Sequence, residues 1–284
     1  MGAGVASAAW LVVAAWPPPA SARPAPQVTP AQPGAPGVTP RDLAEIIAEA
    51  QKVQKEDVSA WRRYRFRRQS LREWFDEDGA QVEKEDLLFV VTPTTNGFDE
   101  ELIRMNGATP SPDDVEHHRR EAKFTRLYNE MMQSESGDVG ESGYTLATLL
   151  KMSAYDYAGM EVVSGVLCHR LDFRPDDSLS WGGIAGKIAK AMSGSLWITA
   201  DGHHMAAART RTVRPVTLFL SLSKVKDLEI TMESRPAPEG VWLPHRIEVV
   251  STARVLFNVL RKRNTVNYSE FEPAPAVEPG ATDR

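Results

Sequence analysis

Hydrophobic side chains occupy every second position in a series of short runs along the second half of the chain, over residues 162–272. Polar residues take the other parity in these runs, as Arg170, Asp172 and Glu229 do. Period-two alternation is typical of β-strands with one buried face and one solvated face. The pattern therefore predicts an antiparallel sheet whose apolar face must be covered by helices, by the sheet's own curvature or by a ligand.

The first half of the chain continues this pattern. Residues 61–75 and 82–93 alternate on either side of a turn signal at Asp78-Gly79, and 101–105 follows as a short strand. Helical stripes interrupt the strands at 41–55, where Thr39 is the expected N-cap, and within an insert at about 110–153. These elements predict an α+β fold that is mainly antiparallel β, in which helices lie across the apolar face of the sheet.

The apolar face of the predicted sheet is the candidate binding surface, because ligand cavities are lined mostly by apolar side chains. The side chains expected to line an apolar cavity are Tyr64, Phe66, Leu87, Phe89, Leu171, Phe173, Leu196, Ile198, Leu220, Leu228, Ile230, Ile247 and Val249. Ile184, Ile188 and Met192 lie on one side of a short predicted helix that follows a glycine-rich stretch. That helix either caps the rim of the barrel or forms a mobile lid over the cavity.

Arginines are dense at residues 62–72, and an acidic run at 83–86 follows the predicted turn. The turn places the two runs opposite each other, so we favour cross-strand ion pairs. Binding of an anionic headgroup by the arginines is the alternative.

The ends of the chain read as separate segments. An apolar run at 5–16, a Pro-Pro-Pro stop and the small residues before Arg23 predict a signal peptide over 1–22 with cleavage near Ala22. The alternative is a disordered Ala/Pro-rich leader of a cytosolic protein. Residues 23–40 predict a disordered Pro/Ala-rich linker, 41–272 a single domain, and 273–284 a disordered tail.

Charge and cysteine content narrow the range of functions. The formal net charge of −5 gives no electrostatic case for binding bulk nucleic acid. Cys168 is the only cysteine, so the chain has no internal disulfide, and its parity places it on the outer or edge face of the sheet. No apolar run after the leader has the length of a transmembrane helix, so the mature chain is expected to have no transmembrane anchor.

Catalytic and metal chemistry find little support in the sequence. The adjacent pairs His117-His118 and His203-His204 do not have the spacing of a zinc site. The acidic runs lie beside turn signals, where solvated charge is expected. No nucleophile–base set or phosphate-binding glycine loop can be assembled. We therefore expect no metal, no cofactor and no enzymatic activity.

Two segments carry a resemblance to a known group. Residues 194–202 (GSLWITADG) and 240–248 (GVWLPHRIE) resemble a hairpin and a strand of bacterial outer-membrane lipoprotein-sorting proteins in the LolA/LolB-like superfamily. Residues 264–271 resemble the closing strand of that fold. The resemblance is closest to secreted members of unassigned role. It implies a curved half-barrel, an incompletely closed antiparallel barrel with helices on its concave face, whose apolar cavity holds acyl chains.

These observations together predict a periplasmic protein that binds a lipid or a lipoprotein acyl chain. Outer-membrane lipoprotein sorting is the process that the resemblance implies. The alternative is a non-catalytic envelope interaction or stress-sensing domain whose helices fill the cavity permanently and whose partner is an envelope protein. In the first hypothesis the apolar face binds the ligand. In the second, the outer face of the sheet or the insert at 110–153 binds the partner.

Overall fold

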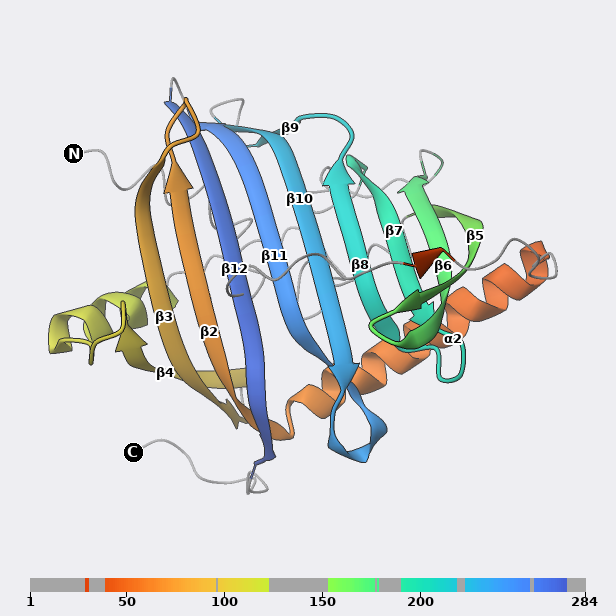
Figure 1. Ribbon diagram of the computed structural model, residues 1–284, viewed down its shortest axis with the longest axis horizontal. Helices are drawn as coiled ribbons and strands as arrows, with labels where there is room; N and C mark the ends of the chain where they lie inside the picture. The colour runs from red at the N-terminus through yellow and green to blue at the C-terminus, as the bar shows by residue number, and fades with distance from the viewer. Residues whose placement is uncertain are drawn as a thin grey trace.

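The computed structural model describes residues 29–30, 39–95, 97–122, 153–176, 178, 190–218, 223–255 and 258–274. These residues form one antiparallel twelve-stranded sheet that curves around a long helix without closing (Figure 1). The predicted fold class, a mainly antiparallel curved half-barrel, is confirmed. The predicted signal peptide at 1–22, the predicted tail from 275, and the residues Ile184, Ile188 and Leu220 lie outside the described residues.

The strand order in space is β1-β5-β6-β7-β8-β10-β11-β12-β2-β3-β4, with β9 paired to β10. The elements are β1 (Thr29–Pro30), α2 (Pro40–Trp61), β2 (Tyr64–Phe75), β3 (Gln81–Thr94), β4 (Gly97–Met105), β5 (Ser153–Val163), β6 (Val166–Pro175), β7 (Met192–Thr199), β8 (Met205–Thr212), β9 (Val216–Leu218), β10 (Ser223–Pro236), β11 (Trp242–Val255) and β12 (Asn258–Pro273). The last strand pairs with the first long one, β12 with β2, so the two ends of the domain meet inside the sheet. The short β1 lies within the segment predicted as a linker and adds to the outer edge of β5.

Helix α2 begins as predicted and ends later. Thr39 caps it, and the side chain of Asp42 bonds back to the Thr39 backbone, which completes a capping box. The sequence placed the end near residue 55 and assigned Trp61 to a strand, but the helix runs to Trp61. The helical stripe continues through Asp57 and Ala60, and the polar Asp57 concealed that continuation.

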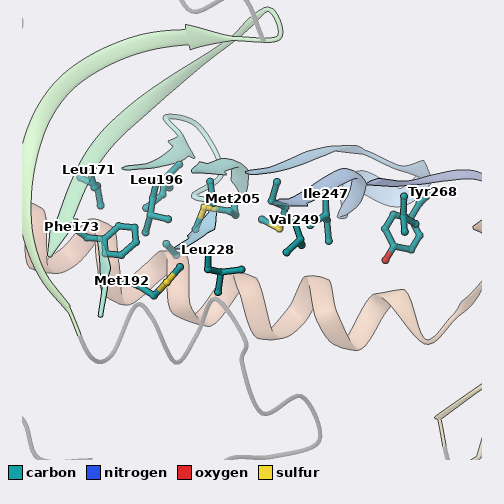
Figure 2. Packing of buried hydrophobic residues seen from close by; sticks show 14 of the residues in the cluster. Leu171, Phe173, Met192, Leu196, Met205, Leu228, Ile247, Val249 and Tyr268 are labelled. Atoms are coloured by element: carbon teal, nitrogen blue, oxygen red, sulfur yellow. The ribbon is translucent and has the colours of Figure 1, made fainter. Parts of the chain in front are cut away.

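The concave face of the sheet carries the main hydrophobic core, and α2 lies across it (Figure 2). Ile46 and Ala50 of the helix face side chains from both halves of the sheet. Val266 and Tyr268 of β12 join this core, as does Met232 of β10. The alternation in the sequence therefore identified the buried face correctly for most strands.

Three positions differ from the expected pattern. Met192 is the first residue of β7 and is buried, so it does not lie on the short helix predicted at 184–193. Leu167 shares the parity of the buried Leu171 and Phe173 in the sequence, which predicts that it is buried, yet the residue is 49% exposed. Cys168 points to the outer face as expected, but it is fully buried there, because Trp197, Ala206 and neighbouring residues form a second, smaller cluster.

Candidate functional site

The candidate site is the concave face of the sheet where α2 packs against it. Among the helix residues whose side chains are described, Ile46, Ala50, Asp57 and Ala60 are buried. Leu43, Ile47 and Trp61 are partly buried and pack against the same core. Most other residues of α2 are exposed or partly exposed, so hydrophobic burial holds this helix less firmly than it holds the strands.

The structure brings most of the predicted lining residues together in this core. Its members from the predicted set are Phe66, Leu87, Phe89, Leu171, Phe173, Leu196, Ile198, Leu228, Ile247 and Val249, with Ile230 partly buried against them. Tyr64 is buried a little apart, with its ring against that of Phe271. Their role in binding a ligand stays a prediction.

An aromatic group closes the concave face at the C-terminal end of α2. The ring of Trp61 lies 5.5 Å from that of Tyr268 and 5.7 Å from that of Phe66, between centroids. Phe98 and Phe271 complete the group, with centroids 5.7 and 5.4 Å from that of Phe66. Edge-to-face and tilted contacts of this kind stabilise the junction beyond the area they bury.

A buried carboxylate fastens α2 to the sheet. Asp57 Oδ2 lies 2.8 Å from His204 Nδ1, and Asp57 Oδ1 accepts the backbone N–H of Trp242 at 3.0 Å. The imidazole of His204 stacks on the indole of Trp242, with centroids 5.8 Å apart. This contact was missed from the sequence, although a single Asp inside an apolar helical stripe is a signal that could have indicated it.

Several polar atoms are buried without a hydrogen-bond partner among the described residues. On the concave side they are Arg68 Nε, Ser70 Oγ, Thr210 Oγ1, Asn264 Oδ1 and Tyr268 Oη, and Trp61 Nε1 of α2 joins them. Native proteins leave few such groups, because each costs about 1–3 kcal/mol. Their concentration on two neighbouring strands, β2 and β12, marks this part of the face as unusual.

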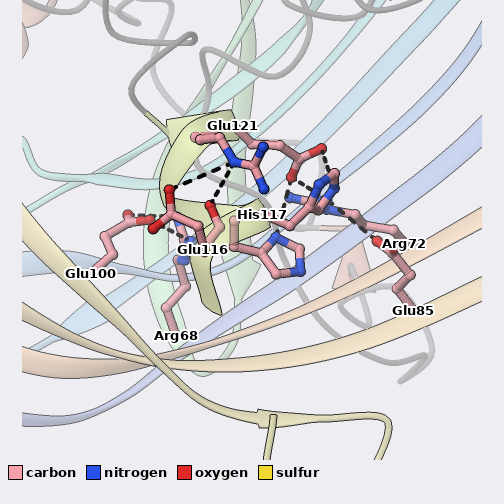
Figure 3. A network of polar contacts seen from close by, with 9 residues as sticks. Arg68, Arg72, Glu85, Glu100, Glu116, His117 and Glu121 are labelled. Carbon is pink, nitrogen blue, oxygen red and sulfur yellow. Dashed lines mark hydrogen bonds and ion pairs between the residues drawn. The ribbon is translucent and has the colours of Figure 1, made fainter. Parts of the chain in front are cut away.

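Arg65 and Arg67 of β2 lie on the outer face of the sheet, whereas Arg68 and Arg72 lie on the concave face. Arg68 makes a bidentate ion pair with Glu100 of β4, both bonds at 2.8 Å, and lies over the ring of Phe89. Arg72 pairs with Glu85 of β3 at 3.3 Å and with Glu121 at 3.4 Å (Figure 3). The predicted pairing with the acidic run therefore holds for Arg72, while Arg68 turns to a different strand.

These ion pairs also attach the helix at 112–122 to the sheet. Ser111 caps this helix, and its hydroxyl accepts the N–H of Asp114 at 3.2 Å. Glu121 accepts a hydrogen bond from His118, which lowers the pKa of this carboxyl to about 2, with further help from Arg72. The remainder of the insert, 123–152, lies outside the described residues.

Lys262 of β12 lies beside this network. Its Nζ is 4.6 Å from the centre of the Trp74 ring, a cation–π contact. Burial, reinforced by repulsion from Arg72, lowers the pKa of Lys262 to about 8. The concave face is thus apolar toward β5–β8 and increasingly polar toward β2 and β3.

Other parts of the described residues give weaker support for a binding or metal site. An open depression of about 420 Å³ is lined by Glu77, Lys226, Asp227, Thr252, Val259 and Arg261, which do not belong to the apolar face. No group of three or more His, Cys, Asp or Glu residues is placed to hold a metal ion in the part of the chain described. No described helix combines the length and the apolar character needed to cross a bilayer.

No protein-family model matches this chain, and no curated protein matches it. Solved structures similar to it include a DUF1329 family protein from Desulfovibrio piger, with 10% identity, a TM-score of 0.36, and coverage of 84% of this chain and 95% of that one. A LolA superfamily protein from Nitrosomonas europaea has 10% identity, a TM-score of 0.35, and coverage of 84% and 97%.

A putative outer membrane lipoprotein-sorting protein domain from Vibrio parahaemolyticus has 10% identity, a TM-score of 0.33, and coverage of 82% and 95%. These neighbours include the group that the two sequence motifs resemble. Their TM-scores are below 0.5, so the function is inferred from this chain's own residues.

Proposed function

We propose that this protein is exported to the periplasm and binds one acyl chain of a lipid or lipoprotein between α2 and the concave face of its sheet. The observation that carries the proposal is the apolar surface of β6, β7, β8, β10 and β11, which among the described residues is covered by α2. The helix at 112–122 covers the other end of the concave face, where His118 contacts Phe89. Such a surface is of the kind that encloses apolar ligands.

Burial of an acyl chain on this face would contribute a substantial binding free energy. Each methylene removed from water contributes about 0.8 kcal/mol, so a sixteen-carbon chain gains on the order of 10 kcal/mol before ordering costs. Moving α2 aside to admit the chain opposes this gain by the contacts of Ile46 and Ala50, by those of the partly buried Leu43, Ile47 and Trp61, and by the bonds of Asp57. We expect burial of the acyl chain to contribute more free energy than these contacts cost.

The test measures uptake of a pyrene-labelled monoacylglycerol by delipidated protein. Ala50 is 2% exposed and faces the core, whereas Ala48 on the same helix is exposed. Ala50→Trp should fill the space beneath the helix and reduce binding at least tenfold, while the matched Ala48→Trp should leave it unchanged. A folded wild-type protein that takes up no probe would refute the proposal.

A second candidate function is favoured by the complete burial of Leu171, Leu196 and Ile198. If α2 covers the face permanently, the domain acts as an envelope interaction module without a lipid. Crosslinking α2 to the sheet, by an engineered disulfide or a chemical reagent, distinguishes the lipid-binding function from the interaction function. A crosslinked protein that keeps its envelope partner but has no lipid uptake before or after reduction would support the second function.

A further inference from the structure

We propose that β2 and β12 carry a polar subsite for an uncharged hydrogen-bond acceptor, which in the ligand is the ester carbonyl of the acyl chain. The inference rests on the proposed function, because the subsite lies on the same concave face. It goes further by naming the chemical group that the protein recognises and the side chains that recognise it.

The first observation is a set of buried polar groups without partners among the described residues. Ser70 and Tyr268 are 0% exposed, Asn264 is 7% exposed and Arg68 is 8% exposed. The unpaired atoms are the hydroxyls of Ser70 and Tyr268, Asn264 Oδ1 and Arg68 Nε. A buried polar atom with no partner destabilises the fold, so four on one face need a reason.

The second observation is that these atoms lie close together. Arg68 of β2 is directly opposite Tyr268 of β12, and Ser70 is directly opposite Val266. Asn264 follows Val266 at the next position on the same face. Trp61 Nε1, also unpaired, comes from α2, whose indole ring is 5.5 Å from the Tyr268 ring. Figure 2 shows the hydroxyl of Tyr268 directed to the side of the sheet on which α2 lies.

The chemistry of the set favours an acceptor. Arg68 Nε–H and Trp61 Nε1–H can only donate, the two hydroxyls can donate, and only Asn264 Oδ1 is restricted to accepting. The charge of Arg68 is already neutralised by the bidentate pair with Glu100. An uncharged carbonyl is therefore preferred to a carboxylate, whose burial would need an uncompensated cation.

The subsite is continuous with the apolar surface. Ser70 belongs to a row of directly opposed residues that runs through Val266 and Ile247 to Met232 on β10. All three neighbours are in the main core. A carbonyl held at Ser70 and Tyr268 would thus place its hydrocarbon chain along the apolar rows toward β8 and β6.

The experiment compares two uncharged lipids that differ only at the carbonyl, monopalmitoylglycerol and 1-O-hexadecylglycerol, by calorimetric titration of the delipidated protein. We expect the ester to bind about tenfold more tightly than the ether. The double variant of Tyr268→Phe and Ser70→Ala should reduce that ratio to about one, with the ether affinity unchanged. The control Ser269→Ala, at an exposed neighbour of Tyr268 on β12, should keep the tenfold ratio.

The outcomes distinguish the subsite from the proposed function. Equal binding of ester and ether by the wild-type protein would overturn the subsite and leave acyl binding standing. Binding of neither lipid would overturn both. Without lipid, Tyr268→Phe should not lower the urea midpoint, since its hydroxyl has no partner to lose. A clearly lowered midpoint would show that protein or water already pairs the hydroxyl, and would also overturn the subsite.

Discussion

The attachment of α2 to the sheet depends on Asp57, and replacing it with alanine tests this directly. The carboxylate is 5% exposed and joins the helix to His204 and to the backbone of Trp242. Asp57→Ala removes both bonds at once and leaves the Trp242 N–H buried without an acceptor. The same change leaves the helical backbone intact, because alanine is the best helix former.

The expected cost follows from the two bonds that are lost. Hydrogen bonds to a charged group contribute about 1.5–3 kcal/mol each, and breaking a buried pair costs about 3–5 kcal/mol. Because His204 retains some contact with solvent, we expect about 3 kcal/mol for Asp57→Ala. Asp57→Asn keeps an oxygen that can accept from Trp242, so its cost should be about 1 kcal/mol.

Urea unfolding followed by tryptophan fluorescence measures both variants. Glu56→Ala is the matched control, because Glu56 is exposed on the same helical turn and should change stability by less than about 0.5 kcal/mol. If Asp57→Ala costs no more than Glu56→Ala, the carboxylate does not hold the helix. If α2 also admits the ligand, Asp57→Asn should increase the rate of acyl-probe uptake.

Three further predictions concern titratable groups. The pKa of Lys262 is lowered to about 8 in the folded protein, so between pH 8 and 10.5 the unfolded chain binds more protons than the folded one. The free energy of unfolding should therefore rise with pH in this range. Lys262→Met should flatten this rise and stabilise the fold at pH 7 by about 1 kcal/mol. Because the pKa of Glu121 is lowered to about 2 in the folded protein, its contribution to the free energy of unfolding is complete above pH 4.5 and is lost as the pH falls toward 2. In acid titrations, Glu121→Gln should therefore remove part of the pH dependence, and unchanged curves would contradict the His118–Glu121 contact. Burial raises the pKa of Cys168 to about 11, so a thiol reagent at pH 8 should label it in urea but not in the native protein.

Local patterns in the sequence were sufficient to predict which face of the sheet is buried and where α2 is capped. Leu171 and Phe173 alternate with Arg170 and Asp172, and the structure buries the first pair and leaves the second partly exposed. The Asp78-Gly79 turn fixed the register that pairs Arg72 with Glu85. In each case the interacting residues are close in sequence or joined by one hairpin.

Contacts that depend on long-range geometry could not be read in this way. Asp57 and His204 are 147 residues apart, and nothing local indicates that the helix end meets this loop. Arg68 pairs with Glu100 across β3, whose register on β4 shifts between Leu88 and Phe89. Cys168 is buried on the outer face because a large neighbour, Trp197, covers it, which strand parity alone does not reveal.

The unpaired polar atoms on the concave face help to decide whether this face serves only as a hydrophobic core or also binds a ligand. A sheet that used it solely for packing would gain stability by replacing Ser70 and Asn264 with apolar residues of similar size, because their polar atoms cost energy without a partner. Proteins retain such costs mainly at functional sites. The helix that covers these atoms is held by two buried core side chains, by the partly buried Leu43, Ile47 and Trp61, and by one carboxylate, so most of its surface remains exposed or partly exposed. Retained polar atoms beneath a lightly held helix are therefore better explained by a ligand than by a permanent core.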